Sequence, residues 1–113
     1  MSRELRVLVE WESVLHRILD TTQNFPKVAR FNFANRIDSL VLDITQTIVQ
    51  AQYTETTLQT EHLNALNIQL AQLRLLLRIS CDRRYLSLGL LEQFIESIDG
   101  IGFQMHSWLK SVQ

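Results

Sequence analysis

Large apolar residues recur every three or four positions along four stretches of the chain, with polar residues between them. This spacing places the apolar side chains on one face of an α-helix, whereas a half-buried strand requires strict alternation. The pattern predicts helices at about residues 3–22, 26–53 and 87–112, and a further helix that starts in the break at residues 53–57, with Thr54 or Thr56 as its cap, and runs to about residue 82. Their expected core stripes are Leu8, Trp11, Leu15 and Ile18; Phe33, Ile37, Leu40, Ile44, Ile48 and Ala51; Leu63, Leu66, Leu70, Leu73 and Leu77; and Leu88, Leu91, Ile95, Ile98, Gly102, Met105, Leu109 and Val112.

Turn-forming residues are scarce, which favours a few long helices over a β fold. The chain contains one proline and three glycines, and Pro26 lies where a proline fits the first turn of a helix. Ser87 precedes the last apolar stripe and is a good candidate for a helix N-cap. The length of 113 residues is that of one domain. We therefore predict an all-α fold, a single up-down-up-down antiparallel four-helix bundle that spans residues 1–113.

The last predicted helix carries more apolar residues than one core stripe accommodates. Phe94, Ile101 and Trp108 repeat every seven residues and lie beside its predicted stripe. Exposed apolar patches with aromatic anchors are typical of interfaces, so these three residues are predicted to contact other copies of the chain or a partner. A wide core that buries them is the alternative. Gly102 lies on the predicted stripe, where a missing side chain lets another helix approach closely.

The charged residues are distributed unevenly, although the net charge is only −1. In an up-down bundle, residues 14–40 and 72–93 lie in the same half, where eight basic and four acidic residues leave a net charge of +4. Such a surface is expected to attract RNA, DNA or an acidic protein. The basic residues predicted to bind it are Lys27, Arg30, Arg36, Arg74, Arg78, Arg83 and Arg84. The alternative is ordinary pairing within helices, as between Arg78 and Asp82.

Residue patterns of a catalytic or metal site are not found in the sequence. His16, His62 and His106 are scattered, and Cys81 is the single cysteine. No His-Glu-x-x-His, Gly-x-Ser-x-Gly or phosphate-binding loop motif occurs. We therefore expect a binding or assembly subunit and not an enzyme, with no metal and no cofactor.

The hydropathy of the chain bears on its localisation. Charged residues interrupt the first dozen positions, and no stretch approaches about 18 consecutive apolar residues. A single cysteine suits a reducing compartment. We expect no signal peptide, no membrane span and a cytoplasmic protein.

Several short segments, taken in their order along the chain, resemble those of a known family. They are residues 25–31 (FPKVARF), 73–79 (LRLLLRI), 85–88 (YLSL), 101–102 (IG) and 108–110 (WLK). In this order and spacing the chain resembles the accessory variability determinant (Avd) proteins of diversity-generating retroelements. It is also similar to the small four-helix bundle proteins encoded in intervening sequences of bacterial large-subunit ribosomal RNA genes.

The resemblance to Avd proteins implies a homopentameric barrel of four-helix subunits with a basic surface. It also implies a non-catalytic accessory subunit that associates with the retroelement's reverse transcriptase and template RNA, and that supports error-prone cDNA synthesis in mutagenic retrohoming. The positions that fit the basic pattern are Lys27, Arg30, Arg74, Arg78, Arg83 and Arg84. Two alternatives remain. One is a bundle of the ribosomal intervening-sequence type with a structural role, and the other is a helical adaptor that binds a partner helix through Phe94, Ile101 and Trp108.

Overall fold

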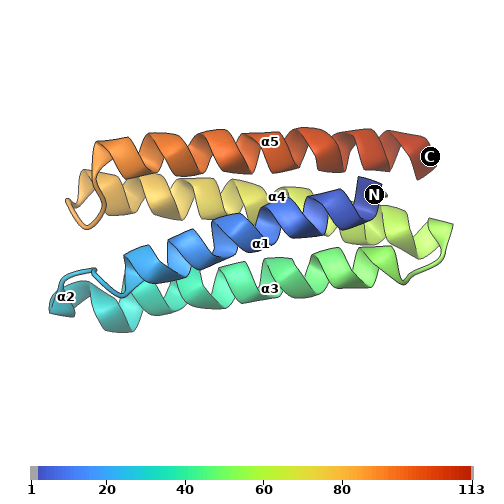
Figure 1. Ribbon diagram of the computed structural model, residues 1–113. Helices are drawn as coiled ribbons and strands as arrows, with labels where there is room; N and C mark the ends of the chain where they lie inside the picture. The colour runs from blue at the N-terminus through green and yellow to red at the C-terminus, as the bar shows by residue number, and fades with distance from the viewer. Residues whose placement is uncertain (1–2, 113) are drawn as a thin grey trace.

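The computed structural model describes residues 3–112, with side chains from Arg6 onward except that of Thr56. Four long helices run alternately up and down along a body of 43 × 23 × 20 Å, which confirms the predicted four-helix bundle. They are α1 (Arg3–Thr22), α3 (Asn35–Gln52), α4 (Thr56–Asp82) and α5 (Leu88–Val112). Figure 1 shows the chain ends and the α3–α4 connection at one end of the bundle. The short helix α2 (Lys27–Ala29), the π-helical segment η1 (Arg30–Ala34) and the α4–α5 connection lie at the other.

Local signals at Pro26 and Ser87 set the starts of two helices, as the sequence predicted, whereas α4 begins after Glu55 without a side-chain cap and not at a cap formed by Thr54 or Thr56. Pro26 directly precedes α2, and its carbonyl oxygen accepts a hydrogen bond from the N–H of Ala29 at an N–O distance of 2.8 Å. The hydroxyl oxygen of Ser87 accepts a hydrogen bond from the N–H of Leu90 at 3.2 Å, which confirms Ser87 as the N-cap of α5. Within the described residues, no helix combines the length and the apolar character that a membrane span requires.

The second predicted helix, residues 26–53, is interrupted by a π-helical segment. In η1 the N–H of Asn35 donates to the carbonyl oxygen of Arg30, five residues earlier, instead of the usual four. Phe33 of η1 packs against the core, whereas Phe31 projects into solvent. Single π-helical turns within α-helices are frequent at functional sites. The apolar periodicity of the sequence did not predict this segment.

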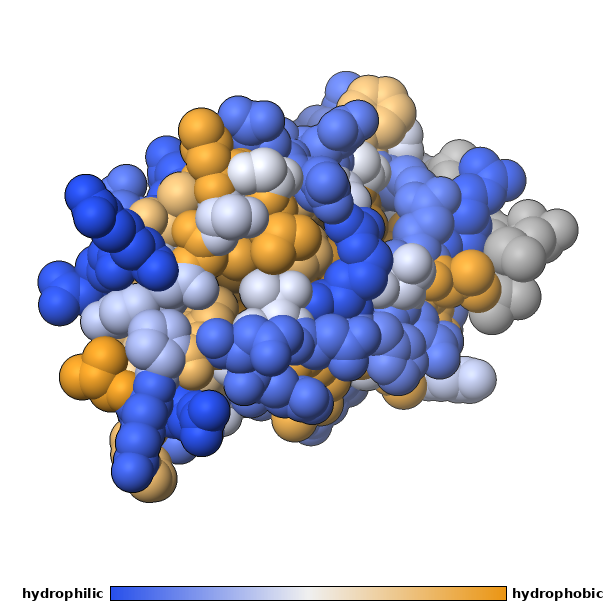
Figure 2. Space-filling model, turned by 60° about the vertical axis from the view of Figure 1, so that its left-hand side comes forward, coloured by the Kyte–Doolittle hydropathy of each residue, from blue (hydrophilic) through white to orange (hydrophobic). Residues whose placement is uncertain are grey.

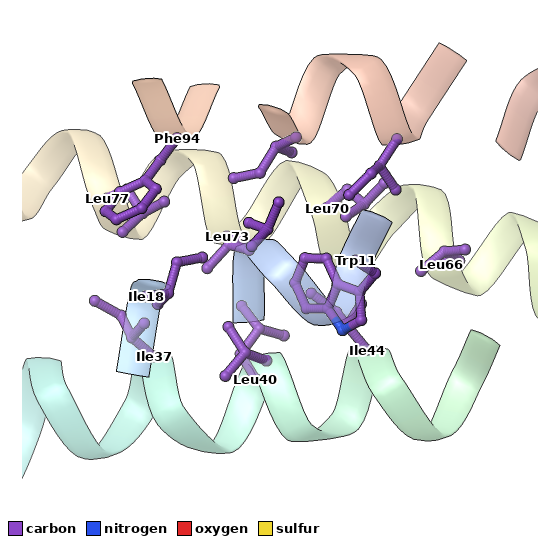
Figure 3. Close-up of a cluster of buried hydrophobic side chains, with 14 of the residues drawn as sticks. Trp11, Ile18, Ile37, Leu40, Ile44, Leu66, Leu70, Leu73, Leu77 and Phe94 are labelled. Atoms are coloured by element: carbon purple, nitrogen blue, oxygen red, sulfur yellow. The ribbon is translucent and has the colours of Figure 1, made fainter. Parts of the chain in front are cut away.

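Each long helix contributes one stripe to the core, and two of these stripes differ from the predicted ones. Figure 3 shows part of this core. In α1 and α5 the buried stripe is shifted by about one position, so that Leu8, Leu15, Leu91 and Leu109 flank the core and are only partly buried, and Leu88, also predicted for the core, is exposed. The buried residues of the four helices include Val7, Trp11, Val14 and Ile18; Ile37, Leu40, Ile44 and Ile48; Leu63, Leu66, Leu70, Leu73 and Leu77; and Phe94, Ile98, Ile101, Met105 and Trp108.

Phe94, Ile101 and Trp108 belong to the core, with 1%, 1% and 0% of their surface exposed. Helices of the same chain cover them, so the predicted contact of these residues with other copies or with a partner helix is wrong. The two apolar stripes of α5 obey the same helical spacing, so periodicity alone did not distinguish the buried stripe from its neighbour. The structure buries the stripe with the large aromatic side chains, which removes their apolar surface from water.

A side chain, and not a helix backbone, occupies the space beside Gly102. A Cβ atom at this position would lie 3.0 Å from Nη2 of Arg74 on α4. The Nε atom of Arg74 lies 2.8 Å from Oδ1 of Asp99, one turn earlier in α5. The glycine therefore makes room for an ion pair between α4 and α5, which corrects the expectation that it lets two helices approach closely.

Helix α4 ends in a Schellman turn that has an arginine where glycine is usual. The N–H of Tyr85 donates to the carbonyl oxygen of Ser80 at 2.8 Å, and the N–H of Arg84 donates to that of Cys81 at 2.9 Å. Arg84 has a φ of 67°. This left-handed conformation costs a non-glycine residue about 1–2 kcal/mol, because its Cβ atom crowds the following carbonyl oxygen.

We expect Arg84→Gly to raise the free energy of unfolding by about 1 kcal/mol, because glycine adopts this conformation without the steric cost. Urea unfolding followed by circular dichroism measures the change. Arg84→Ala is the matched control, since alanine also removes the charge but keeps the Cβ atom. Equal stability of the two variants would contradict the explanation.

Candidate nucleic-acid interface

Three aromatic side chains hold the α4–α5 connection against residues 25–34, the segment that contains α2 and η1. The ring of Tyr85 packs at a tilt against Phe25, with centroids 5.9 Å apart, and edge-on against Phe33, with centroids 5.5 Å apart. Such tilted and edge-on pairs are favourable arrangements of aromatic rings. Because Phe25 precedes α2 and Phe33 lies in η1, these contacts bring residues 27–36 and residues 83–84 together. Two basic segments that are distant in the sequence thus lie at one end of the bundle (Figure 1).

We call the exposed basic residues of this region the basic end. Its members are Lys27, Arg30, Arg36, Arg78, Arg83 and Arg84. Among the described residues, no carboxylate forms an ion pair with any of them. The alternative pairing of Arg78 with Asp82 within α4 is not formed, so these positive charges face solvent.

The acidic residues of the same half do not neutralise the basic end. A carboxylate oxygen of Asp38 accepts a hydrogen bond from the hydroxyl of Thr22 at 2.6 Å, which ties α3 to the end of α1. Asp20, Asp82 and Glu92 are exposed, and none of them forms an ion pair with a described residue. Residues 14–40 and 72–93 contain eight bases and four carboxylates, and the pairing of Arg74 with Asp99 removes one base, so this half of the molecule remains positively charged.

Tyr85 also positions Arg83. The Nε atom of Arg83 donates to the tyrosine hydroxyl at 3.2 Å, and the guanidinium carbon lies 5.8 Å from the centroid of the ring. This hydrogen bond, together with the electrostatic effect of Tyr85, raises the pKa of Arg83 above its ordinary value. The contact with Tyr85 holds the guanidinium partly in place before any ligand binds.

The bases of residues 27–36 project from helical backbone that packs on the core. The Nε atom of Arg30 points back to the carbonyl oxygen of Phe25 at 3.5 Å. Arg36 lines an open cavity of about 350 Å³ with Phe33 and Leu76, between η1 and α4. These arginines therefore project from a supported surface and not from a long loop.

Arg74 stands apart from the other residues predicted to bind nucleic acid. Its side chain is partly buried, and Asp99 neutralises its charge across the α4–α5 contact. Arg78, one turn closer to the end of α4, is exposed and forms no ion pair with a described residue, although the groove of about 560 Å³ that it lines also contains Glu92, Glu96 and Asp99 of α5. Arg78 therefore belongs to the basic end, whereas Arg74 joins two helices.

Two residues that shape this end, Tyr85 and Phe31, were not predicted as site residues from the sequence. Tyr85 is the contact that joins the two basic segments, and Phe31 has 87% of its surface exposed beside Arg30. The available signal for Phe31 was an aromatic residue next to a base in a polar stretch. The role of Tyr85 depends on contacts between distant segments, which the sequence does not display.

A family model described as bAvd-like matches residues 6–112. The chain belongs to the bAvd-like family. The match includes every member of the basic end, and it confirms the resemblance to Avd proteins. A comparison with curated proteins found no match.

The basic end of this bAvd-like bundle combines charged and apolar surface. Figure 2 turns the end that carries α2 toward the viewer and shows strongly hydrophilic side chains, in dark blue, around and between apolar patches in orange. The exposed apolar residues of the segments at this end include Val28, Phe31 and Leu88. Such a surface suits a ligand with both anionic and flat apolar parts, as nucleic acids have.

Proposed function

We propose that this bAvd-like chain is a non-catalytic accessory subunit of a diversity-generating retroelement. In this role it binds the reverse transcriptase and the template RNA during mutagenic retrohoming. The observation that carries the proposal is the basic end, whose six exposed bases form no ion pair with any residue that the structure describes. Membership of the bAvd-like family supports the same role.

The chemistry of the basic end favours phosphate ligands. Five of its six members are arginines, and the planar guanidinium group donates two parallel hydrogen bonds to one phosphate. Each phosphate that is neutralised releases bound counterions, so RNA binding is expected to weaken steeply with salt. DNA carries the same phosphates, so any preference for RNA has to come from other contacts.

We also propose that the chains assemble into the homopentameric barrel that the resemblance implies. Since Phe94, Ile101 and Trp108 are buried, other residues have to form the contact between copies. Exposed apolar side chains that remain available on α3 and α4 are Leu42, Val49, Leu58, Ile68 and Leu75. A ring would place several basic ends on one rim, and simultaneous contacts with one RNA would raise the affinity above that of a single chain.

We expect replacement of both Arg83 and Arg84 by glutamate to weaken RNA binding about tenfold or more at about 50 mM salt, because it removes two phosphate contacts and adds two repulsive charges. The loss of two contacts to a single strand is also expected to reduce the slope of log affinity against log salt by about 1.4. Fluorescence anisotropy with a labelled single-stranded RNA measures both quantities.

The matched control replaces Arg6 and Lys110 by glutamate. It changes the net charge by the same amount on exposed residues near the opposite end of the bundle. Unchanged affinity of the Arg83/Arg84 variant, or an equal loss in both variants, would count against the basic end as the binding surface. Co-elution of the same proteins with purified reverse transcriptase tests the polymerase contact separately.

The surroundings of the gene separate the retroelement role from the ribosomal intervening-sequence alternative. A neighbouring reverse transcriptase gene with paired template and variable repeats is expected for the first role. An insert in a ribosomal RNA gene is expected for the second.

A further inference from the structure

Phe31 exposes its ring beside the bases of the basic end without contributing to the core. Its surface is 87% exposed, whereas Phe33, two residues later in η1, packs edge-on against Tyr85. Phenylalanine is among the residue types most often buried, because an exposed ring leaves apolar surface in water. The fold gains little from this ring in its present position, and the ring is open to a ligand.

The neighbours of Phe31 along the chain, residues 27–36, are cationic or neutral. Lys27 lies one turn before it and Arg30 immediately before it, and both are exposed. The acidic residue that follows in the chain, Asp38, accepts a hydrogen bond from Thr22 and points toward α1. A ligand that fits this surface therefore carries anionic groups beside a flat apolar group.

We propose that Phe31 stacks on one unpaired base of single-stranded RNA, while Lys27 and Arg30 bind the phosphates beside that base. This inference deepens the proposed RNA binding and rests on it. Every base has a π-face, so stacking on an aromatic side chain tolerates any sequence. In a duplex each base is covered by its neighbours, and a short side chain on a helix surface does not reach a free base face.

A protein partner fits this surface less well than a single strand does. A specific protein interface requires roughly 800 Å² from each partner, with a continuous apolar centre. Phe31 and Val28 are the exposed apolar residues of this short stretch. Their exposed polar and charged neighbours are Lys27, Arg30, Asn32 and Asn35. An aromatic ring among cations is instead typical of surfaces that bind single-stranded nucleic acid.

We expect Phe31→Ala to weaken binding of a labelled single-stranded RNA of about 12 nucleotides roughly 5- to 100-fold, the range for the loss of one base–aromatic stack. The slope of log affinity against log salt is expected to stay unchanged, because no phosphate contact is lost. Phe31→Trp is expected to bind at least as tightly as the wild type. Phe31→Leu, which is apolar without an aromatic face, is expected to bind as weakly as the alanine variant. A duplex RNA of the same length is expected to bind all four proteins equally.

The outcomes of this experiment separate the inference from the proposed function. Phe103→Ala is the matched control, since Phe103 is also exposed but lies on α5. This variant is expected to bind RNA as tightly as the wild type does. Wild-type affinity of Phe31→Ala, together with a loss in the Arg83/Arg84 variant, overturns the stacking and leaves the proposed function standing. If neither variant weakens binding, the proposed function fails as well.

Two further results would identify Phe31 as an apolar protein contact and overturn the inference. The first is wild-type RNA affinity of Phe31→Leu. The second is a Phe31→Ala variant that binds RNA normally but no longer co-elutes with the reverse transcriptase. Circular dichroism checks that each variant is folded, which we expect because the ring of Phe31 lies outside the core.

Discussion

Phe94→Ala is expected to lower the free energy of unfolding by about 3–5 kcal/mol, the usual cost of truncating a buried phenylalanine. The ring is 1% exposed and lies among the core side chains that Figure 3 shows. The guanidinium carbon of Arg17 lies 5.3 Å from its centroid, and Arg17 also donates to Oε1 of Gln93, so the ring lies beneath a contact between α1 and α5. Loss of the ring removes buried apolar area and leaves a cavity. Chemical denaturation followed by circular dichroism measures the change.

Phe103→Ala is the control for this prediction, because the same ring is lost from a position that is 76% exposed on the same helix. Its expected effect is within about 0.5 kcal/mol, as for most surface substitutions. Denaturation at several protein concentrations, with light scattering in parallel, separates folding from assembly. If Phe94→Ala left the stability of the chain unchanged but dissociated an oligomer, the placement of Phe94 in the core would be refuted.

Trp11→Ala is expected to have a similar effect, a loss of about 3–5 kcal/mol in the free energy of unfolding. Trp11 is fully buried, and its Nε1 atom donates to the hydroxyl oxygen of Thr45 on α3 at 2.8 Å. That hydroxyl donates in turn to the carbonyl oxygen of Val41 at 2.8 Å, so its orientation is set within α3. The substitution therefore removes both a large apolar side chain and a hydrogen bond between α1 and α3. The midpoint of urea unfolding reports the loss.

Replacement of each buried tryptophan by phenylalanine tests the contribution of the hydrogen bond. Trp108 is also fully buried, but its Nε1 atom has no acceptor among the described residues. Trp108→Phe removes an unpaired donor, whereas Trp11→Phe breaks a formed hydrogen bond. We therefore expect Trp11→Phe to cost about 1–2 kcal/mol more than Trp108→Phe. Equal costs would mean that the bond between Trp11 and Thr45 contributes nothing to stability.

The sequence predicted in which half of the molecule the candidate site lies, but it did not predict which side chains form its surface. Helix order placed Arg30 and Arg83 in the same half, because consecutive helices of an up-down bundle run in opposite directions. The sequence did not predict that Asp99 takes Arg74 out of this set, nor that Phe31 is exposed among the bases. Both depend on which side chains meet across helices, and the spacing along one helix carries no such information.

The sequence by itself determined the number of helices, their approximate bounds and the family. These features depend on local chemistry, such as the 3.6-residue period of apolar residues and the capping hydroxyl of Ser87. The tertiary structure alone decided which of two neighbouring stripes on α5 is buried, the one with Phe94 or the one with Leu91. It also decided that Tyr85 joins two basic segments by packing on Phe33. Burial and contact between distant residues are set by how all four helices fill a common core, a condition that no single segment of the chain contains.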